Sequence, residues 1–104
     1  MIPRIALTPG EPAGIGPDVT LAIAQHAWNA ELVAICDPQL MRERAKILDL
    51  EVEIQVIDSP LGEPSPHQPG TLQIYPVSLT VPCKPGQPDP ANASYVVNTL
   101  HAAV

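Results

Sequence analysis

The chain has 104 residues, enough for one small domain, and 45% of them are apolar, which excludes a wholly disordered polypeptide. The net charge is −6, the basic residues form no run, and no apolar stretch approaches the ~20 residues of a membrane span, so we expect neither a nucleic acid nor a membrane as partner. Cys36 and Cys83 have neither metal-binding nor redox spacing, which favours a cytoplasmic location with reduced thiols.

The first elements are an apolar strand and an amphipathic helix. Residues 2–8 (IPRIALT) predict a short buried strand that ends at a Pro-Gly pair. A helix is predicted from Pro17 to Asn29, because Pro17 suits a first helical position and Asp18 favours the positive end of the helix dipole. The apolar face expected for this helix consists of Val19, Ala22, Ile23 and Ala27.

The next stretch repeats this order of strand and helix. Residues 31–36 (ELVAIC) predict a second strand, 39–48 (QLMRERAKIL) a helix, and 51–57 (EVEIQVI) a third strand. A β-α-β-α-β order predicts an α/β fold with a mostly parallel sheet covered by helices. The expected apolar side of the second helix consists of Leu40, Met41, Ala45 and Leu48. The side chains expected mostly on its solvent side are Arg42, Glu43, Arg44 and Lys46.

The second half of the chain is rich in proline. Residues 59–70 predict a linker, and 71–82 predict short strands at the edge of the sheet, because Pro76 is unfavourable in a central strand. Residues 91–104 predict a last helix, which reaches the final residue without a stop signal, as a truncated chain would. Its expected apolar face consists of Val96, Val97, Leu100 and Ala103.

The turn at residues 8–18 (TPGEPAGIGPD) has two interpretations. A glycine-rich turn between a strand and a helix exposes backbone N–H groups, and a phosphate or carboxamide could approach Gly14 and Gly16 closely. Alternatively, Gly10, Gly14 and Gly16 only supply positive φ angles for a sharp corner. The spacing also resembles the dinucleotide fingerprint G-x-G-x-x-G without its third glycine, and Asp37 follows where a ribose-binding acid would lie.

Other candidate residues are few. His26, His67 and His101 have no second ligand at a metal-binding spacing, so we interpret them as surface or boundary residues. Glu51 and Glu53 alternate with apolar residues and are expected on the solvent face of their strand.

The turn, preceded by its short apolar strand, resembles the N-terminal signature of the 4-hydroxythreonine-4-phosphate dehydrogenase family. The similarity continues through residues 31–50 (ELVAICDPQLMRERAKILDL), 70–77 (GTLQIYPV) and 94–103 (SYVVNTLHAA), in the family's order. The family often has Asp at the position of Glu11 and Glu at that of Asp18, so both differences keep the charge. The turn also resembles that of isocitrate and isopropylmalate dehydrogenases.

The resemblance implies a homodimeric enzyme with the two-domain fold of isocitrate and isopropylmalate dehydrogenases, of which residues 1–104 form the N-terminal part. Such an enzyme uses NAD and a divalent metal (Zn, Mg or Co) to oxidise a phosphorylated hydroxy-amino acid, 4-phosphohydroxy-L-threonine. The product of this oxidation is a 3-keto acid, which loses carbon dioxide to give 3-amino-2-oxopropyl phosphate, in pyridoxine and pyridoxal phosphate biosynthesis.

The resemblance also implies where the site residues lie. The family's metal-binding histidines, substrate residues and most of its NAD pocket follow beyond these residues, and His26, His67 and His101 match none of them. The related dehydrogenases place the isoleucine of the turn beside the cofactor, which assigns Gly14, Ile15 and Gly16 to the cofactor side.

We expect residues 1–104 alone to be inactive, with no catalytic or metal-binding residue, and to expose a strand edge and apolar helix faces. The alternatives are a non-catalytic fragment and a small Rossmann-like nucleotide-binding module.

Overall fold

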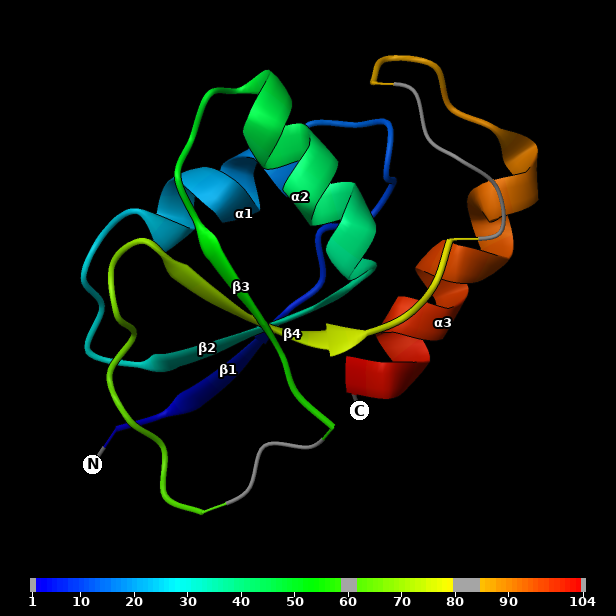
Figure 1. Cartoon of the computed structure of the whole chain (residues 1–104). Helices are drawn as coiled ribbons and strands as arrows, with labels where there is room; N and C mark the ends of the chain where they lie inside the picture. Colours follow the sequence, from blue (N-terminus) through cyan, green and yellow to red (C-terminus); the bar gives the residue numbers. More distant parts are fainter. Residues whose placement is uncertain (1, 59–61, 80–84, 104) are drawn as a thin grey trace.

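The chain forms a four-stranded parallel sheet with helices, as the computed structural model shows for residues 2–58, 62–79 and 85–103 (Figure 1). The strand order is β1-β2-β4-β3, and every neighbouring pair is parallel. The predicted α/β fold class is therefore confirmed. The elements are β1 (Arg4–Leu7), α1 (Gly16–Ala24), β2 (Glu31–Cys36), α2 (Pro38–Ile47), β3 (Glu53–Val56), β4 (Thr71–Pro76), the 3-10 turn η1 (Pro90–Asn92) and α3 (Ala93–Ala103).

The core lies between one face of the sheet and the helices α1 and α2, which sit side by side on it (Figure 1). Both helices lie on one face because the connections from β1 to β2 and from β2 to β3 run in the same direction across the sheet, and such crossovers are right-handed. The strands contribute Ala34, Cys36, Leu72 and Ile74 to the core, and the helices contribute Leu21, Ala24, Met41, Ala45 and Tyr95.

The opposite face carries the linker and the end of α3. The chain returns from β3 to the adjacent β4, against the earlier direction, so this connection passes over the other face. There Arg4 pairs with Glu31 and donates a hydrogen bond to the Gly62 carbonyl. The end of α3 lies over the same face, and with it forms a hollow of about 410 Å³ whose lining includes Ala6, Val33, Ile35, Tyr75, Ala102 and Ala103.

Two predictions about the sheet are wrong. The first strand was expected to be buried, but β1 lies at an edge of the sheet and its four residues are half-buried or exposed. The strand at 71–76 is not at an edge, because β4 pairs with β2 on one side and β3 on the other. Pro76 is tolerated in this central strand because it occupies the last position, where the ladder ends. The second strand expected within 78–82 lies mostly outside the described residues.

The helix α1 ends at Ala24, five residues before the predicted Asn29. The helix closes with a tighter turn, in which Gln25 and His26 donate to Ala22 O and Ile23 O, and its last carbonyls also bind the linker and a nearby side chain. The Ala24 carbonyl accepts hydrogen bonds from Gly70 N–H and from Nε2 of His67, at 2.9 and 2.8 Å, and the indole of Trp28 donates to Ile23 O at 2.8 Å. These bonds satisfy the helix end and let the chain turn back toward β2.

The predicted apolar faces of two helices are also wrong. In α1 the buried residues are Pro17, Thr20, Leu21 and Ala24, whereas the predicted Val19, Ala22 and Ala27 are exposed and Ile23 is half-buried. In α3 the buried residues are Tyr95 and Thr99, while Val96 is half-buried and Val97, Leu100 and Ala103 are exposed. The expected exposure of apolar helix faces is confirmed at Val19, Val97 and Leu100. Within the described ranges, no helix has the length and apolarity to cross a membrane.

Candidate functional site

The glycine-rich turn lies where β1 ends, at the carboxyl edge of the parallel sheet. Ligands of open α/β proteins bind at this edge, because loops and helix N-termini converge there. The turn spans the residues between Leu7 and Gly16, and α1 follows it directly. Its position therefore agrees with a ligand-binding role, and its geometry shows how the shape is fixed.

The three glycines of the turn have different roles, which corrects the expectation that all of them supply positive φ angles. Only Gly10 does so, with φ of +81°. Gly16 is needed for a close approach, because a Cβ atom there would lie 1.7 Å from the Pro9 carbonyl oxygen. Gly14 is less crowded, since its Cβ would lie 3.3 Å from Glu11 O. The turn thus folds back on the first residue of α1.

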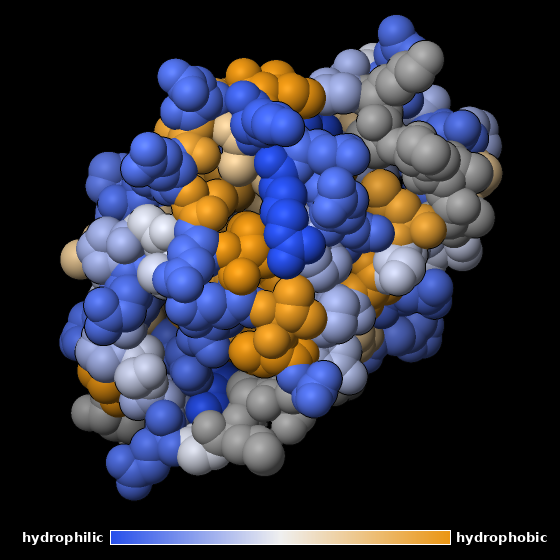
Figure 2. Space-filling model, viewed as in Figure 1, coloured by the Kyte–Doolittle hydropathy of each residue, from blue (hydrophilic) through white to orange (hydrophobic). Residues whose placement is uncertain are grey.

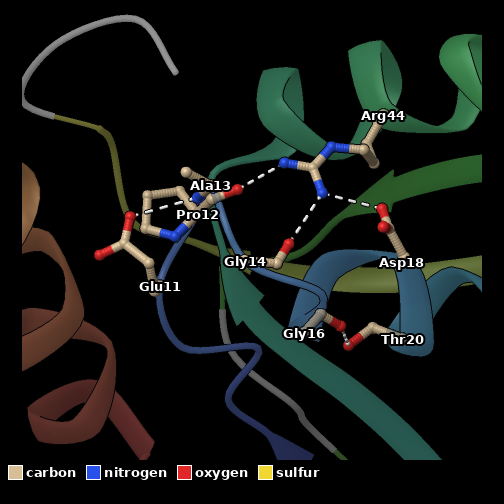
Figure 3. Close-up of polar contacts among 8 residues, drawn as sticks. All are labelled: Glu11, Pro12, Ala13, Gly14, Gly16, Asp18, Thr20 and Arg44. Carbon is tan, nitrogen blue, oxygen red and sulfur yellow. Dashed lines mark hydrogen bonds and ion pairs between the residues drawn. The ribbon is translucent and has the colours of Figure 1, made fainter. Parts of the chain in front are cut away.

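Arg44 of α2 holds this turn from the inside (Figure 3). Its Nη1 donates to Gly14 O at 3.0 Å and to Oδ1 of Asp18 at 2.8 Å, and its Nη2 donates to Pro12 O. The side chain is only 3% exposed, whereas that of Asp18 is 37% exposed. A buried cation is thereby paired with one carboxylate and two backbone carbonyls, as a buried charge requires.

The prediction that Arg44 faces solvent is wrong, although the sequence held a signal for its burial. Arg44 follows Leu40 by four residues and Met41 by three, so it lies on the apolar side of α2. Of the residues predicted on the apolar side, Leu40, Met41 and Ala45 are buried as expected, whereas Leu48 is 39% exposed, so that prediction is wrong. A cation at an apolar position of an amphipathic helix indicates a buried partner. Here the neighbouring charged residues Arg42, Glu43 and Lys46 make Arg44 look like part of a solvent-exposed face.

The outer surface of the turn is formed by Ile15, which is 76% exposed. Ile15 is also the N-cap of α1, where its carbonyl accepts from Val19 N–H at 2.9 Å but its side chain offers no hydrogen bond to the helix start. On the side away from Arg44, a carboxylate oxygen of Glu11 accepts from Ala13 N–H at 3.2 Å (Figure 3), and Gly86 N–H donates to Ala13 O at 2.8 Å. The turn therefore presents to solvent an apolar side chain beside a helix start that has no side-chain cap.

Asp37, the candidate ribose-binding acid, has a structural role. Its Oδ1 accepts from the N–H groups of Gln39 and Leu40, at 2.8 and 3.2 Å, which caps α2. Its Oδ2 accepts from Leu79 N–H at 2.8 Å. Three of the roughly four acceptor positions of this carboxylate therefore serve backbone donors, so Asp37 could accept from both hydroxyls of a ribose only by losing one of these donors. The geometry gives no support to a dinucleotide-binding role for this residue.

The histidines and Cys36 do not form a site. His26 and His101 are exposed, as expected, but His67 is buried, because it packs beside Trp28 and bonds to Ala24 O. In the described part of the chain, no three His, Cys, Asp or Glu side chains are grouped to hold a metal ion. Burial, aided by the nearby Asp37 carboxylate, raises the pKa of the Cys36 thiol from 9.0 to about 12, so it is unreactive at neutral pH. Cys83 lies outside the described residues.

A groove on the other side of α2 is separate from the turn. This groove of about 850 Å³ lies between α2 and β3, and its apolar floor is flanked by charged side chains (Figure 2). Apolar residues of this groove are Ala45, Leu50, Val52 and Ile54, and charged ones include Arg42, Lys46, Glu51 and Glu53. The two glutamates are exposed, as predicted, and no residue of the turn lines the groove.

The chain is similar over nearly its full length to known enzymes. It is 48% identical over 102 residues to the 4-hydroxythreonine-4-phosphate dehydrogenase of Thioalkalivibrio sulfidiphilus, a match covering 98% of this chain and 30% of that protein. It is 48% identical over 104 residues to the enzyme of the same name from Colwellia psychrerythraea, covering 99% of this chain and 31% of that one. A comparison with protein-family models finds no match.

Solved structures agree on the fold. Crystal structures of 4-hydroxythreonine-4-phosphate dehydrogenases from Burkholderia phymatum and Klebsiella pneumoniae superpose with TM-scores of 0.84 and 0.83, at 20% and 24% identity. Each match covers 99% of this chain and 32% of the solved one, and these enzymes have the isocitrate/isopropylmalate dehydrogenase-like fold. The chain therefore spans about 30% of the length of the curated relatives it matches. Over that stretch, its resemblance to the 4-hydroxythreonine-4-phosphate dehydrogenases is confirmed.

Proposed function

We propose that residues 1–104 form the N-terminal part of a two-domain, homodimeric dehydrogenase that acts in the cytoplasm on 4-phosphohydroxy-L-threonine. The observation that carries this proposal is the 48% identity to enzymes named for this activity, which extends through the turn and across nearly the whole chain. The proposed product is a 3-keto acid that loses carbon dioxide to give 3-amino-2-oxopropyl phosphate, for pyridoxal phosphate biosynthesis. NAD supplies the hydride acceptor for the oxidation of the secondary alcohol.

The turn fits a place on the cofactor side of such a site. The space that side chains would take at Gly16 and Gly14 is filled by the backbone of Pro9 and Glu11, so a ligand would meet this stretch at its outer surface. There Ile15 offers an exposed apolar side chain next to the start of α1. We assign Gly14, Ile15 and Gly16 to cofactor contact on this basis. In this role Ile15 excludes water from one side of the cofactor, and the backbone of Gly14 and Gly16 holds Ile15 in place.

The proposed divalent metal does not fit the described residues. Since no group of three suitable ligands exists among them, we assign no metal ligand and no catalytic group within residues 2–58, 62–79 or 85–103. The metal and the reacting atoms of the substrate would then be held by the additional polypeptide that the relatives possess. We therefore propose that residues 1–104 alone have no dehydrogenase activity.

The test compares two proteins, the product of the complete reading frame and residues 1–104 alone. Each is assayed for NADH formation with NAD and 4-phosphohydroxy-L-threonine, with and without added divalent metal. We expect turnover only in the first protein. No turnover in either protein under any metal would contradict the enzyme proposal, and turnover by residues 1–104 alone would contradict the proposed division of the site. Saturable NAD binding by the inactive stretch would favour a nucleotide-binding module.

A further inference from the structure

Arg44 donates three hydrogen bonds to the glycine-rich turn and to the first helical turn of α1, which follows it. Two of the acceptors are the carbonyls of Pro12 and Gly14, and the third is the carboxylate of Asp18. Because the guanidinium is 3% exposed, water cannot replace these acceptors. The conformation of the turn is therefore coupled to the presence of a cation at this position.

The hydrogen bonds to carbonyls also fix the direction of the neighbouring N–H groups. No peptide bond described is cis, and in a trans peptide the carbonyl and the following N–H point in opposite directions. With Pro12 O directed at Arg44, the N–H of Ala13 must point away, and it does so by meeting the Glu11 carboxylate (Figure 3). With Gly14 O directed at Arg44, the N–H of Ile15 must likewise point away from Arg44.

We propose that Arg44 is a positioning residue for the cofactor side of the site: by drawing the carbonyls of Pro12 and Gly14 inward, it turns the backbone and side chain of Ile15 outward. This inference rests on the proposed function, because it takes the outer surface of the turn as the cofactor contact. Arg44 itself touches no ligand, and its effect passes through the turn.

An arginine is needed because the acceptors are spread over two nitrogens. Nη1 serves Gly14 O and Asp18, while Nη2 serves Pro12 O, so the planar fork holds two peptide groups at once. A lysine keeps the charge but has a single ammonium on a flexible stem, and it cannot reproduce this two-point geometry. The Arg44→Lys variant therefore separates the shape of the turn from the charge that balances Asp18.

The experiment uses the product of the complete reading frame with Arg44→Lys, Arg44→Met and, as matched control, Arg42→Met. Arg42 is exposed on the same helix and lines the separate groove. For each protein we would measure the Kd of NAD, kcat, both KM values, the melting temperature, and hydrogen exchange of residues 8–18. Misplacing substrate-positioning groups by about 1 Å can lower the rate of an enzyme on the order of a hundredfold.

We expect Arg44→Lys to raise the Kd and KM for NAD about tenfold or more, to speed exchange in residues 8–18, and to leave the KM for the phosphorylated substrate within about twofold. Arg44→Met should show a larger effect in the same direction, and Arg42→Met none. If Arg44→Lys lowers the melting temperature but leaves the Kd for NAD unchanged, Arg44 is only structural and the proposal fails. If the unaltered protein does not bind NAD, the proposed function fails. In that case, unchanged hydrogen exchange of residues 8–18 in Arg44→Lys would also overturn the role of Arg44 in the turn.

Discussion

Replacing Gly16 by alanine tests whether the turn depends on the close approach of its own backbone. The added Cβ would lie 1.7 Å from Pro9 O, whereas such atoms stay at least 3.0 Å apart, so the turn and α1 must separate by at least 1.3 Å. The obstacle is a backbone atom, which cannot move aside as a flexible side-chain end does. Gly16 has no positive φ, so steric conflict is the sole cost to the backbone.

The expected destabilisation is about 2–3 kcal/mol. Overpacking a close-packed site costs about 1–3 kcal/mol, and a rigid neighbour places this change near the upper end. The higher helix propensity of alanine returns at most about 1 kcal/mol, and less at a helix start. For a domain of this size, we expect the melting temperature to fall by roughly 10 °C.

The measurement is urea unfolding followed by circular dichroism, with Gly14→Ala as the control. That substitution also adds one methyl group to the turn, but its Cβ would meet Glu11 O at 3.3 Å, which a shift of a few tenths of an ångström relieves. We expect Gly14→Ala to stay within about 1 kcal/mol of the unaltered protein. Equal effects of the two substitutions, or a loss below about 0.5 kcal/mol for Gly16→Ala, would refute the close approach as the reason for glycine.

Three further changes test other parts of the structure by urea unfolding. Arg44→Met should cost about 2–3 kcal/mol, less than the ~3–5 kcal/mol of a fully buried pair because Asp18 is 37% exposed, and Arg42→Met should cost under about 0.5 kcal/mol. Asp37→Ala should cost about 1–2 kcal/mol through loss of the cap of α2, and an unchanged midpoint would contradict the capping role. Burial raises the pKa of the Cys36 thiol to about 12 in the folded protein, whereas the pKa is 9.0 in the unfolded chain. The unfolded state therefore loses this proton first, and stability should fall as the pH rises between these two values. The fall contributed by this thiol is at most about 1.4 kcal/mol per pH unit, and Cys36→Ala should remove it; equal slopes in both proteins would argue against this pKa.

The strands could be predicted from the sequence because their signal is local. Residues 31–36 form a fully buried strand with the predicted bounds, and the alternation of strands and helices gave the parallel sheet. The central position of β4 could not be predicted in this way. It depends on the chain returning from β3 to the place between β3 and β2. In addition, a proline at the last residue of a central strand looks the same in the sequence as one in an edge strand.

The shape of the candidate site could not be predicted from the sequence, for a different reason. Gly16 is required by Pro9, seven residues earlier, and this contact exists only once the turn has folded back. The turn itself was recognised by its resemblance to a family, which gave the positions of Gly14, Ile15 and Gly16 but not the role of Arg44. The buried arginine comes from the next helix, so its partners belong to tertiary structure.

The wrong apolar face of α1 has the same origin. Successive helical residues are about 100° apart, which places one apolar stripe on each side of Asp18 around the helix. The first stripe is Val19, Ala22 and Ile23, and the second is Pro17, Leu21 and Ala24. Periodicity alone cannot choose between them. The ion pair with Arg44 directs Asp18 toward α2, and the second stripe then faces the sheet. The contacts that shape the turn therefore also set the rotation of α1, and a change at Arg44 acts on both.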